Sequence, residues 1–372
     1  MNIASTIFSN LLAGDPREGR TLWLPPPDSN LAANSDHMFW WINIICYFFF
    51  IGIVIALVIL VVKYRMKKDR PFRTDGPLHH LPLETTWAVV PLLIVIFIFY
   101  FGFRDYLNFM TPPKNSYEIA VTAQKWGWLF KYPNGATSDD LYVPTGRPVK
   151  LSMRSSDVLH CCYIPDFRVK KDLVPGRYSY LWFQTDDVTP EGWGHNLFCA
   201  EYCGTGHSNM NRKVYALAQP EFDAWLTAQS QWLDKIPEEE LYFRAGPKLY
   251  ARCQQCHSLD GTKGIGPSWK GLWARVSGGE GGDGKFVDGT GYQSQIGAGK
   301  QYQTPEDYIR SSILNPGEHV VAGYANAMPS FKGQLNDKGI DAVIGFMKHL
   351  DEFDTKGKYL KEVPAAPKVS MK

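Results

Sequence analysis

The stretch FCAEYCGTGHSNM, residues 198–210, gathers two cysteines, a histidine and a methionine in one short segment. Cys199 and Cys203 stand four positions apart, His207 follows after four more, and Met210 after another three. The whole chain of 372 residues has seven cysteines, so this spacing calls for a chemical reason. Thiolate sulfur, imidazole nitrogen and thioether sulfur together form a ligand set suited to copper.

The second cysteine distinguishes a mononuclear copper site from one with two coppers. A mononuclear electron-transfer copper takes two histidines, one cysteine and a weak methionine. His160, after the strand-like run in SSDVLHCCYIP, can supply the second histidine. Two thiolates can bridge two coppers, each with its own histidine. A disulfide or a structural zinc would also use two cysteines, but neither accounts for the methionine.

Upstream of this segment, the distribution of apolar residues indicates membrane helices. Met38 to Val62 is a run of 25 residues without charge, and Thr85 to Phe103 is a second of 19. At about 1.5 Å per residue the first run spans a hydrocarbon core of about 30 Å with some tilt, and the second is just long enough. A buried core helix is the alternative for the second run alone. Two such runs around a short basic loop favour a membrane hairpin.

The loop between the runs carries six basic residues, and basic residues in short loops stay cytoplasmic. Both termini are then expected outside the cytoplasm. The first residues, MNIASTIFSNLLAG, lack the basic start of a signal peptide. The net charge of +2 gives no indication of nucleic-acid binding. The basic residues of the loop are Lys63, Arg65, Lys67, Lys68, Arg70 and Arg73.

Residues 115–220 have the pattern of a β domain. Short runs such as YEIAVTA, PVKLSM and YSYLWF alternate with turn signals such as PNG, PTG and VPG. In QKWGWLFKY, aromatic residues occupy positions 126, 128, 130 and 132, and a period of two places them on one strand face. The segment 221–236, EFDAWLTAQSQWLDKI, has helical spacing and is expected to connect this domain to the next.

A second chemical motif follows in ARCQQCHSLDG, where Cys253, Cys256 and His257 form the C-x-x-C-H attachment signal of c-type haem. A zinc or redox CxxC is the alternative. In a haem domain two thioether bonds hold the porphyrin, and the adjacent histidine binds the iron. An axial sulfur on the other side would raise the iron potential, and Met328 in GYANAMPSFKGQL offers one.

The order of hairpin, β domain and CAEYCGTGHSNM resembles subunit II of the haem–copper cytochrome c oxidases over residues 36–220. The segment SSDVLHCCYIPDFRVKKDLVPGR resembles the first copper-ligand segment of that family. The resemblance implies a cupredoxin-like sandwich with a dinuclear CuA centre of two coppers. It also implies a magnesium site reached by the Glu201 carboxylate, and makes Trp126 the candidate electron-entry residue. The implied CuA ligands are His160, Cys199, the Glu201 backbone carbonyl, Cys203, His207 and Met210.

Residues 240–352 resemble class I cytochrome c, most closely the domain fused to subunit II in some bacterial oxidases. The resemblance implies one covalently attached haem c, with His257 and Met328 as axial ligands. We therefore expect a multidomain membrane protein with a two-helix transmembrane hairpin, an all-β cupredoxin-like sandwich and an all-α class I cytochrome c domain. The expected bounds are 1–36 for an extracytoplasmic segment, 37–106 for the hairpin, 107–220 for the CuA domain, 221–239 for a helical linker, 240–352 for the cytochrome domain and 353–372 for a flexible tail.

Other residues are assigned structural roles. Cys161 and Cys162 depart from the family pattern, and because adjacent strand residues point to opposite faces, both cannot reach one metal. They are interpreted as packing residues. His195 has no second ligand nearby in sequence and is interpreted as structural. The stretch GEGGDGK, 279–285, lacks the serine or threonine of a phosphate loop and is interpreted as a surface loop.

The resemblance implies the electron-entry subunit of a respiratory terminal oxidase in a bacterial plasma membrane. Its partners would be catalytic subunit I, subunit III, the lipid bilayer and reduced cytochrome c or another donor, with oxygen reduction and proton pumping elsewhere in the complex. Glu84 resembles a family glutamate at the mouth of a proton channel, or is an interfacial carboxylate at a helix start. The alternatives are a related CuA subunit of a nitric oxide reductase-like complex, and a membrane-anchored electron carrier without a catalytic partner.

Overall fold

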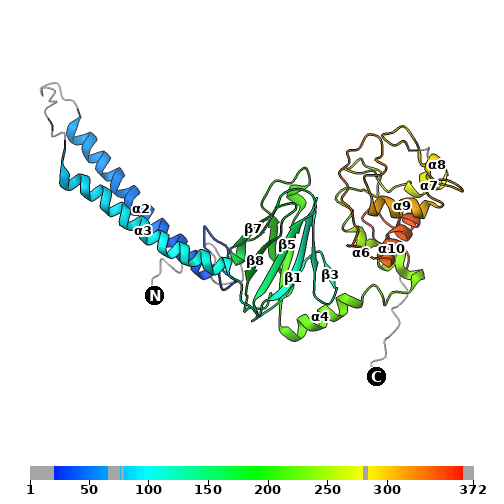
Figure 1. Ribbon diagram of the computed structural model, residues 1–372, viewed down its shortest axis with the longest axis horizontal. Coiled ribbons are helices and arrows are strands. Elements are labelled where there is room, and N and C mark those ends of the chain that lie inside the picture. The colour runs from blue at the N-terminus through cyan, green and yellow to red at the C-terminus, as the bar shows by residue number, and fades with distance from the viewer. Residues whose placement is uncertain (1–20, 66–75, 77–78, 280–283, 363–372) are drawn as a thin grey trace.

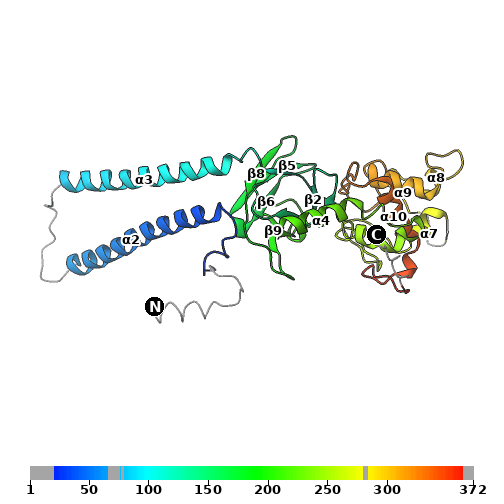
Figure 2. The same cartoon turned by 90° about the horizontal axis from the view of Figure 1, so that it is seen from below.

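The computed structural model describes residues 21–65, 76, 79–279 and 284–362. Three bodies follow one another along its long axis: a helical hairpin, a β-sandwich and a helical domain (Figure 1). The view turned by 90° shows the same order, with the helical domain beyond the sandwich on the side away from the hairpin (Figure 2). The stretch 279–285, the basic loop and both chain ends lie partly or wholly outside the described residues, so those assignments stay predictions.

The hairpin consists of α2 (Ala32–Tyr64) and α3 (Leu81–Met110), longer at both ends than the uncharged runs. Both helices are long and apolar enough to cross a membrane, and their most apolar windows have no buried share within the chain. Apolar side chains exposed in this way require a nonaqueous surrounding, because such a surface in water would be unfavourable. The two apolar helices therefore fit a membrane protein with two spans.

The central domain packs two sheets of five strands face to face. One sheet has the order β3-β2-β1-β5-β8 and the other β4-β10-β9-β6-β7. The first contains β1 (Tyr117–Gln124), β2 (Gly127–Lys131), β3 (Thr137–Ser138), β5 (Val149–Ser155) and β8 (Ser179–Phe183). The second contains β4 (Leu141–Pro144), β6 (His160–Ile164), β7 (Val169–Leu173), β9 (His195–Cys199) and β10 (Arg212–Leu217).

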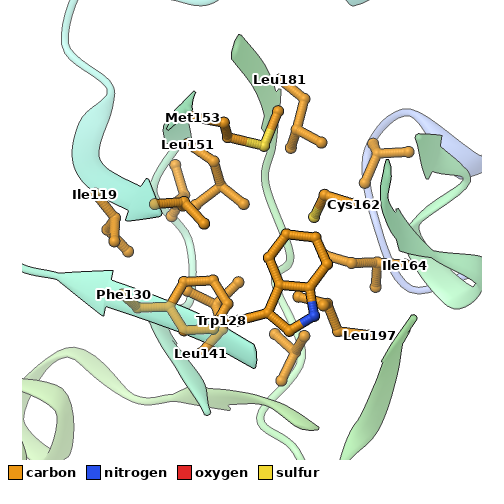
Figure 3. Packing of buried hydrophobic residues seen from close by; sticks show 14 of the residues in the cluster. Ile119, Trp128, Phe130, Leu141, Leu151, Met153, Cys162, Ile164, Leu181 and Leu197 are labelled. Carbon is orange, nitrogen blue, oxygen red and sulfur yellow. The ribbon is translucent and has the colours of Figure 1, made fainter. Parts of the chain in front are cut away.

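Alternating burial along the strands builds the sandwich core. In β5, burial follows the period of two that the sequence pattern predicts, with Val149, Leu151 and Met153 fully buried. Figure 3 shows Leu151 and Met153 packed with Trp128 of the same sheet and with Cys162 of the facing sheet. The all-β, cupredoxin-like sandwich predicted from the sequence is thus the observed fold of this domain.

The aromatic stripe differs in part from its prediction. Trp128 and Phe130 lie in β2 and are buried, but the strand begins at Gly127. Trp126 stands in the turn between β1 and β2, so it leaves the strand face and packs on a different part of the domain. The short segment η1 (Pro165–Phe167) and the single turn η2 (His207–Asn209) complete the connections around the second sheet.

The connector helix α4 (Gln219–Gln231) leads to the C-terminal helical domain. Residues 241–250 form two short helices in succession, and Pro247 stands in the first turn of the second. The last long helix, α10, begins after Asn336, whose side chain accepts a hydrogen bond of 2.9 Å from the Gly339 amide. The elements are η3 (Glu238–Glu240), α5 (Leu241–Arg244), α6 (Gly246–Tyr250), α7 (Leu272–Ser277), α8 (Tyr292–Gln295), α9 (Pro305–Leu314), α10 (Asp337–Lys348) and η4 (Leu350–Glu352).

The segment that follows α10 differs from the predicted flexible tail. Phe353 is 7% exposed, with its ring centroid 4.5 Å from that of Phe346. Tyr359 stacks on Phe243 at 4.9 Å between centroids, and its hydroxyl lies 3.1 Å from that of Tyr242. Residues 353–359 therefore belong to the packed domain, because their aromatic rings complete its core.

Candidate metal centre and haem cavity

The two cysteines of the opening stretch lie side by side where the central strand of the second sheet, β9, ends and its following loop begins. Cys199 ends β9, and its partner across the sheet is Cys162 of β6. The sulfurs of Cys199 and Cys203 are 3.8 Å apart, so both are free thiols and the predicted alternative of a disulfide is absent from the structure. Both side chains are buried, at 7% and 4% exposure.

One histidine faces each of these sulfurs. The Nδ1 atom of His160 lies 3.8 Å from the Cys199 sulfur, and Nδ1 of His207 lies 3.5 Å from the Cys203 sulfur. His160 begins β6, and the antiparallel pairing of β6 with β9 brings it beside the loop that follows Cys199. The Nε2 atom of His160 contacts the Asp157 carboxylate at 2.9 Å, which leaves Nδ1 available as a ligand atom.

Two weaker donors complete the group. The Met210 sulfur is 3.9 Å from the Cys203 sulfur, and Met210 is fully buried. The backbone carbonyl oxygen of Glu201 lies 3.1 Å from the Cys199 sulfur. The structure thus brings together all the donor atoms that the resemblance assigned to the copper centre. Among the described residues, the set of His, Cys, Asp or Glu close enough to hold a metal is His160, Cys199 and Cys203.

The protonation of the two thiols shows why they suit a cation. Burial raises the pKa of Cys199, but hydrogen bonds, first that from His160, outweigh it and lower this pKa to about 6. Burial and the negative charge of Cys199 raise the pKa of Cys203 to about 12. One thiol therefore ionises at neutral pH at the expense of the other. Positive ions between the sulfurs would let both become thiolates.

Trp126 covers the loop that carries these ligands. Its indole Nε1 donates a hydrogen bond of 3.3 Å to the Cys203 carbonyl. The ring lies so close to Gly206 that a Cβ atom there would come within 2.6 Å of it, so the contact requires glycine. Trp126 is 7% exposed, and it also lines the cavity of the helical domain.

That cavity is lined by the residues of the C-x-x-C-H motif. Cys253, Cys256 and His257 all border it. The Nδ1 atom of His257 lies 2.7 Å from the Pro267 carbonyl, so Nδ1–H donates to it and Nε2 is left as the ligand atom. Gly266 is required here, since a Cβ atom would approach the imidazole to 2.6 Å.

The chemistry of these side chains fits an attached porphyrin better than a redox dithiol. Burial raises the pKa of Cys253 to about 12 and also raises that of Cys256, whereas reactive CxxC thiols have lowered values. Burial lowers the pKa of His257 against the opposing hydrogen bond to Pro267, which keeps the imidazole neutral as an iron ligand must be. Met328 borders the same cavity, as the axial-ligand prediction requires.

Two further side chains with predicted roles are those of Glu84 and Glu201. Glu84 stands in the first turn of α3, where its Oε1 accepts a hydrogen bond of 2.9 Å from the His80 amide. The His80 side chain accepts in turn from the Leu83 amide at 3.3 Å, which completes a helix cap. This cap accounts for Glu84 without a proton channel, and the channel assignment stays a prediction. The Glu201 side chain is exposed, and its magnesium role is likewise untested.

Cys161 and Cys162 are both fully buried, and Cys162 packs within the sandwich core (Figure 3). His195 is also fully buried, with its two ring nitrogens 2.8 Å from Asp166 and 3.0 Å from Asp28. Sequence reasoning missed these carboxylate partners, and it missed Asp157. Asp157 could have been found from its position three residues before His160. Asp28 lies far from His195 in sequence, so no local signal pointed to it.

Fold and site together define a class: a cupredoxin-like domain on a two-helix membrane hairpin, followed by a cytochrome c domain. Family models agree with each part. The transmembrane domain of cytochrome c oxidase subunit II matches residues 20–104, its periplasmic domain matches 100–217, and cytochrome c matches 243–351. The chain belongs to the cytochrome c oxidase subunit II family and carries a C-terminal cytochrome c domain. These two domain types imply copper and haem binding.

Named relatives agree with this membership. Cytochrome c oxidase subunit 2 of Alkalihalophilus pseudofirmus is 29% identical over 269 residues, which cover 68% of this chain and 72% of the relative. The Synechocystis protein of the same name is 28% identical, covering 56% and 76%. Among solved structures, the periplasmic domain of cytochrome oxidase subunit II from Bradyrhizobium japonicum is 23% identical, with a TM-score of 0.31 over 33% of this chain and 99% of that domain.

Proposed function

We propose that this chain is the electron-entry subunit of a respiratory terminal oxidase in a bacterial plasma membrane. In this proposal the cytochrome domain receives electrons from reduced cytochrome c or another respiratory donor. They pass to a dinuclear copper centre and then to a separate haem–copper subunit, where oxygen is reduced to water and protons are pumped. The family of the chain and its two adjacent candidate redox sites support this role.

The residues that would hold two coppers are the sulfurs of Cys199 and Cys203 as bridges, with His160 and His207 as nitrogen ligands. Met210 and the Glu201 carbonyl are the weak donors. When bound, the pair of coppers supplies one-electron redox chemistry with the charge shared over both ions. The protein keeps the ligands in place, since Asp157 fixes the His160 ring and each donor lies within 4 Å of at least one of the two cysteine sulfurs. The thioether favours copper over a structural zinc.

Cys253 and Cys256 would form the thioether bonds of haem c, with His257 and Met328 as axial ligands. Pro267 orients the His257 ring through its carbonyl, and apolar side chains make up much of the lining of the cavity. Trp126 occupies the space between this cavity and the copper loop, through its hydrogen bond to the Cys203 carbonyl. It is therefore the residue that we assign to electron entry into the copper centre.

The proposal also covers orientation and partners. Subunit I would accept the electron, and the complex would include subunit III and the surrounding lipid. The sandwich, the cytochrome domain and both termini would lie outside the cytoplasm. The assignment of Glu201 to an intersubunit magnesium site and of Glu84 to a channel mouth belongs to the same proposal, and depends on the catalytic subunit.

One observation carries the proposal: two unbonded sulfurs 3.8 Å apart, each facing its own imidazole, lie beside the haem-attachment cavity. The test is metal analysis of the purified chain with spectra at defined potentials. Two coppers with a mixed-valence signal and one covalent haem per chain are expected, and a chain that binds zinc instead would contradict the proposal. Oxygen uptake, compared with nitric oxide uptake, by the purified complex then distinguishes the oxidase from a reductase. A carrier without a catalytic partner would purify alone.

A further inference from the structure

The cytochrome domain meets the sandwich through a small set of polar contacts, which we call the seam. The first contact is an ion pair between Arg252 and Asp139. The guanidinium Nε lies 2.9 Å and 3.2 Å from the two carboxylate oxygens. The side chains are 14% and 28% exposed, so solvent screens the pair only in part. Arg252 directly precedes the first haem cysteine, and this ion pair thus anchors the attachment segment.

The second contact joins the other side of the cavity to the sandwich. The amides of Gln124 and Gln334 pair reciprocally, with N–O distances of 3.3 Å and 2.7 Å. Gln124 is the last residue of β1 and is 8% exposed. Gln334 also donates to the Ser330 carbonyl at 3.0 Å, in the loop that carries Met328. The seam therefore holds both walls of the haem cavity, the attachment segment and the axial-methionine loop.

The third contact lies directly at the copper loop. The Gln255 amide, between the two haem cysteines, donates to the Asn209 carbonyl at 3.3 Å. Asn209 precedes the copper-ligand candidate Met210. Nearby, Cys256 and Ile265 pack against the core of the sandwich. The edge of the cytochrome domain that carries the haem cysteines thus faces the copper loop rather than solvent.

This arrangement covers Trp126. The ring has the copper loop on one side and borders the haem cavity on the other, together with Lys125. With 7% of its surface exposed, Trp126 offers little area to a second protein. An external donor that needed this residue to reach copper would have to displace the cytochrome domain first.

We propose that the seam locks the cytochrome domain over Trp126, so that an external donor reaches the copper centre only by way of the chain's own haem. This inference rests on the proposed function and adds to it a restriction on the route by which external electrons reach the copper centre. Asp139, Arg252, Gln124 and Gln334 are positioning residues in this scheme. One electron leaves the donor, reduces the attached haem, and then passes inward and reduces the copper pair, so each step oxidises one centre and reduces the next without a bond change.

A structural test asks whether the seam covers Trp126. Asp139→Lys places two cations together and should open the seam, because interfaces of this polar kind within a chain are readily separated. Hydroxyl-radical footprinting should then show increased oxidation of the Trp126 ring, while Trp128, 3% exposed in the core, stays protected as an internal reference. Unchanged Trp126 protection in the variant would overturn the proposal.

Matched variants separate the seam from the change in net charge. Asp187→Lys makes the same charge change on the loop between β8 and β9, where the neighbouring Gln184 contacts Asn30 of the N-terminal segment. It should behave like the wild type. The double variant Asp139→Lys with Arg252→Glu restores an ion pair of reversed sign and should restore Trp126 protection. Exposure of Trp126 in the Asp187 variant, or failure of the double variant to recover it, would count against the seam.

A kinetic test uses the full chain, mixed rapidly with a reduced soluble cytochrome c. In the wild type the haem should be reduced first, and copper should follow at a rate independent of donor concentration. In Asp139→Lys this internal rate should fall by roughly tenfold or more, and a direct copper reduction proportional to donor concentration should appear. Direct reduction already in the wild type would overturn the seam proposal alone. Copper that stays oxidised after the haem is reduced would overturn the proposed function with it.

Discussion

The sulfurs of Cys199 and Cys203, both buried, lie 3.8 Å apart without a bond between them. They are not independent, because ionisation of Cys199 raises the pKa of Cys203. His160 faces the Cys199 sulfur and His207 faces the Cys203 sulfur, so each sulfur has one imidazole within 4 Å. In the proposed function, cations bind both sulfurs at once, and the loss of each ligand then has its own measurable effect.

Cys199→Ser should remove one of the two bridging sulfurs. A hydroxyl is a poor ligand for a soft metal, so the paired site should lose copper and its mixed-valence signal, falling from two ions per chain to one at most. Electron paramagnetic resonance and metal analysis measure this. The haem spectrum should be unchanged because Cys253 and Cys256 lie in another domain. An intact mixed-valence signal in the variant would contradict the bridge.

Met328→Ala should lower the potential of the haem iron. Thioether ligation raises that potential, and axial ligands shift haem potentials over a range of about 0.8 V, so we expect a fall on the order of 100 mV or more. A redox titration of the purified chain measures it. Met347→Leu is the matched control, since Met347 is buried in the same domain at 4% exposure and also borders the cavity. Equal potentials in the wild type and Met328→Ala would exclude Met328 as the ligand.

Sequence reasoning could identify His160, His207 and the two cysteines because their residue types and spacing are specific to metal chemistry. It could not derive the position of Trp126, since the two-residue alternation suggested a strand face. The structure places Trp126 in the turn before β2, where its ring turns to the metal loop. Residues in turns escape periodic patterns, and only the family resemblance pointed to this one.

At the scale of the element, the segment before α2 is attached to the sandwich through a buried charge cluster. His195 of β9 lies between Asp166 of η1 and Asp28 of the N-terminal segment. Burial lowers the pKa of His195, but hydrogen bonds and charges from Asp166 and Asp28 outweigh it and raise the net pKa. The imidazolium thus joins three separate segments near the point where the hairpin meets the sandwich.

His195→Gln should destabilise the sandwich by about 3–5 kcal/mol at pH 6, because it leaves two largely buried carboxylates without their cation. The folded pKa lies above the unfolded value of about 6.5. The stabilisation is therefore complete below that value and is lost as the pH rises through the folded pKa. Denaturant unfolding of the full chain at several pH values should show the difference between wild type and variant shrinking toward alkaline pH.

A matched control for this variant is His349→Gln. His349 is 42% exposed and lies 3.7 Å from Glu352, so its removal should cost less than about 1 kcal/mol. A stability difference for His195→Gln that is constant from acidic to alkaline pH would contradict the charge-cluster explanation.

The elements themselves were largely predictable, and the misses have physical causes. Uncharged runs predicted both membrane helices, but the polar ends of α2 and α3 are helical too, since backbone hydrogen bonds continue beyond the apolar core. The region after α10 was predicted as a loose tail from its charge. Phe353 and Tyr359 bind it to the domain instead, because two aromatic rings outweigh the surrounding lysines.

At the scale of the whole molecule, the relative placement of the domains could not be predicted from the sequence. Asp139 and Arg252 are separated by 113 positions, and Gln124 and Gln334 by 210. No local pattern signals such pairs, because each residue alone looks like an ordinary polar surface residue. The seam exists only once both domains are folded, and it brings two separately predictable sites to one tryptophan.

The N-terminal segment gives the molecule a testable orientation. The Asp28 amide donates to the Asp166 carbonyl at 2.9 Å, and the Ser29 hydroxyl to the Phe167 carbonyl at 2.8 Å. The segment before α2 and the sandwich after α3 therefore lie on the same side of the hairpin (Figure 2). In the proposed orientation this side is outside the cytoplasm, as the basic residues between the two membrane runs predict.

An impermeant thiol reagent on spheroplasts tests this orientation. Asp187 is exposed in a loop of the sandwich. Asp187→Cys should be labelled in intact spheroplasts, since the proposed orientation places this loop in the outer medium. Thr74→Cys, between the two membrane runs, should be labelled only after permeabilisation, because the bilayer separates it from the reagent. The chain without added cysteine gives the background from native thiols. Labelling of Thr74→Cys before permeabilisation, with Asp187→Cys protected, would reverse the orientation and place the candidate copper and haem sites on the cytoplasmic side.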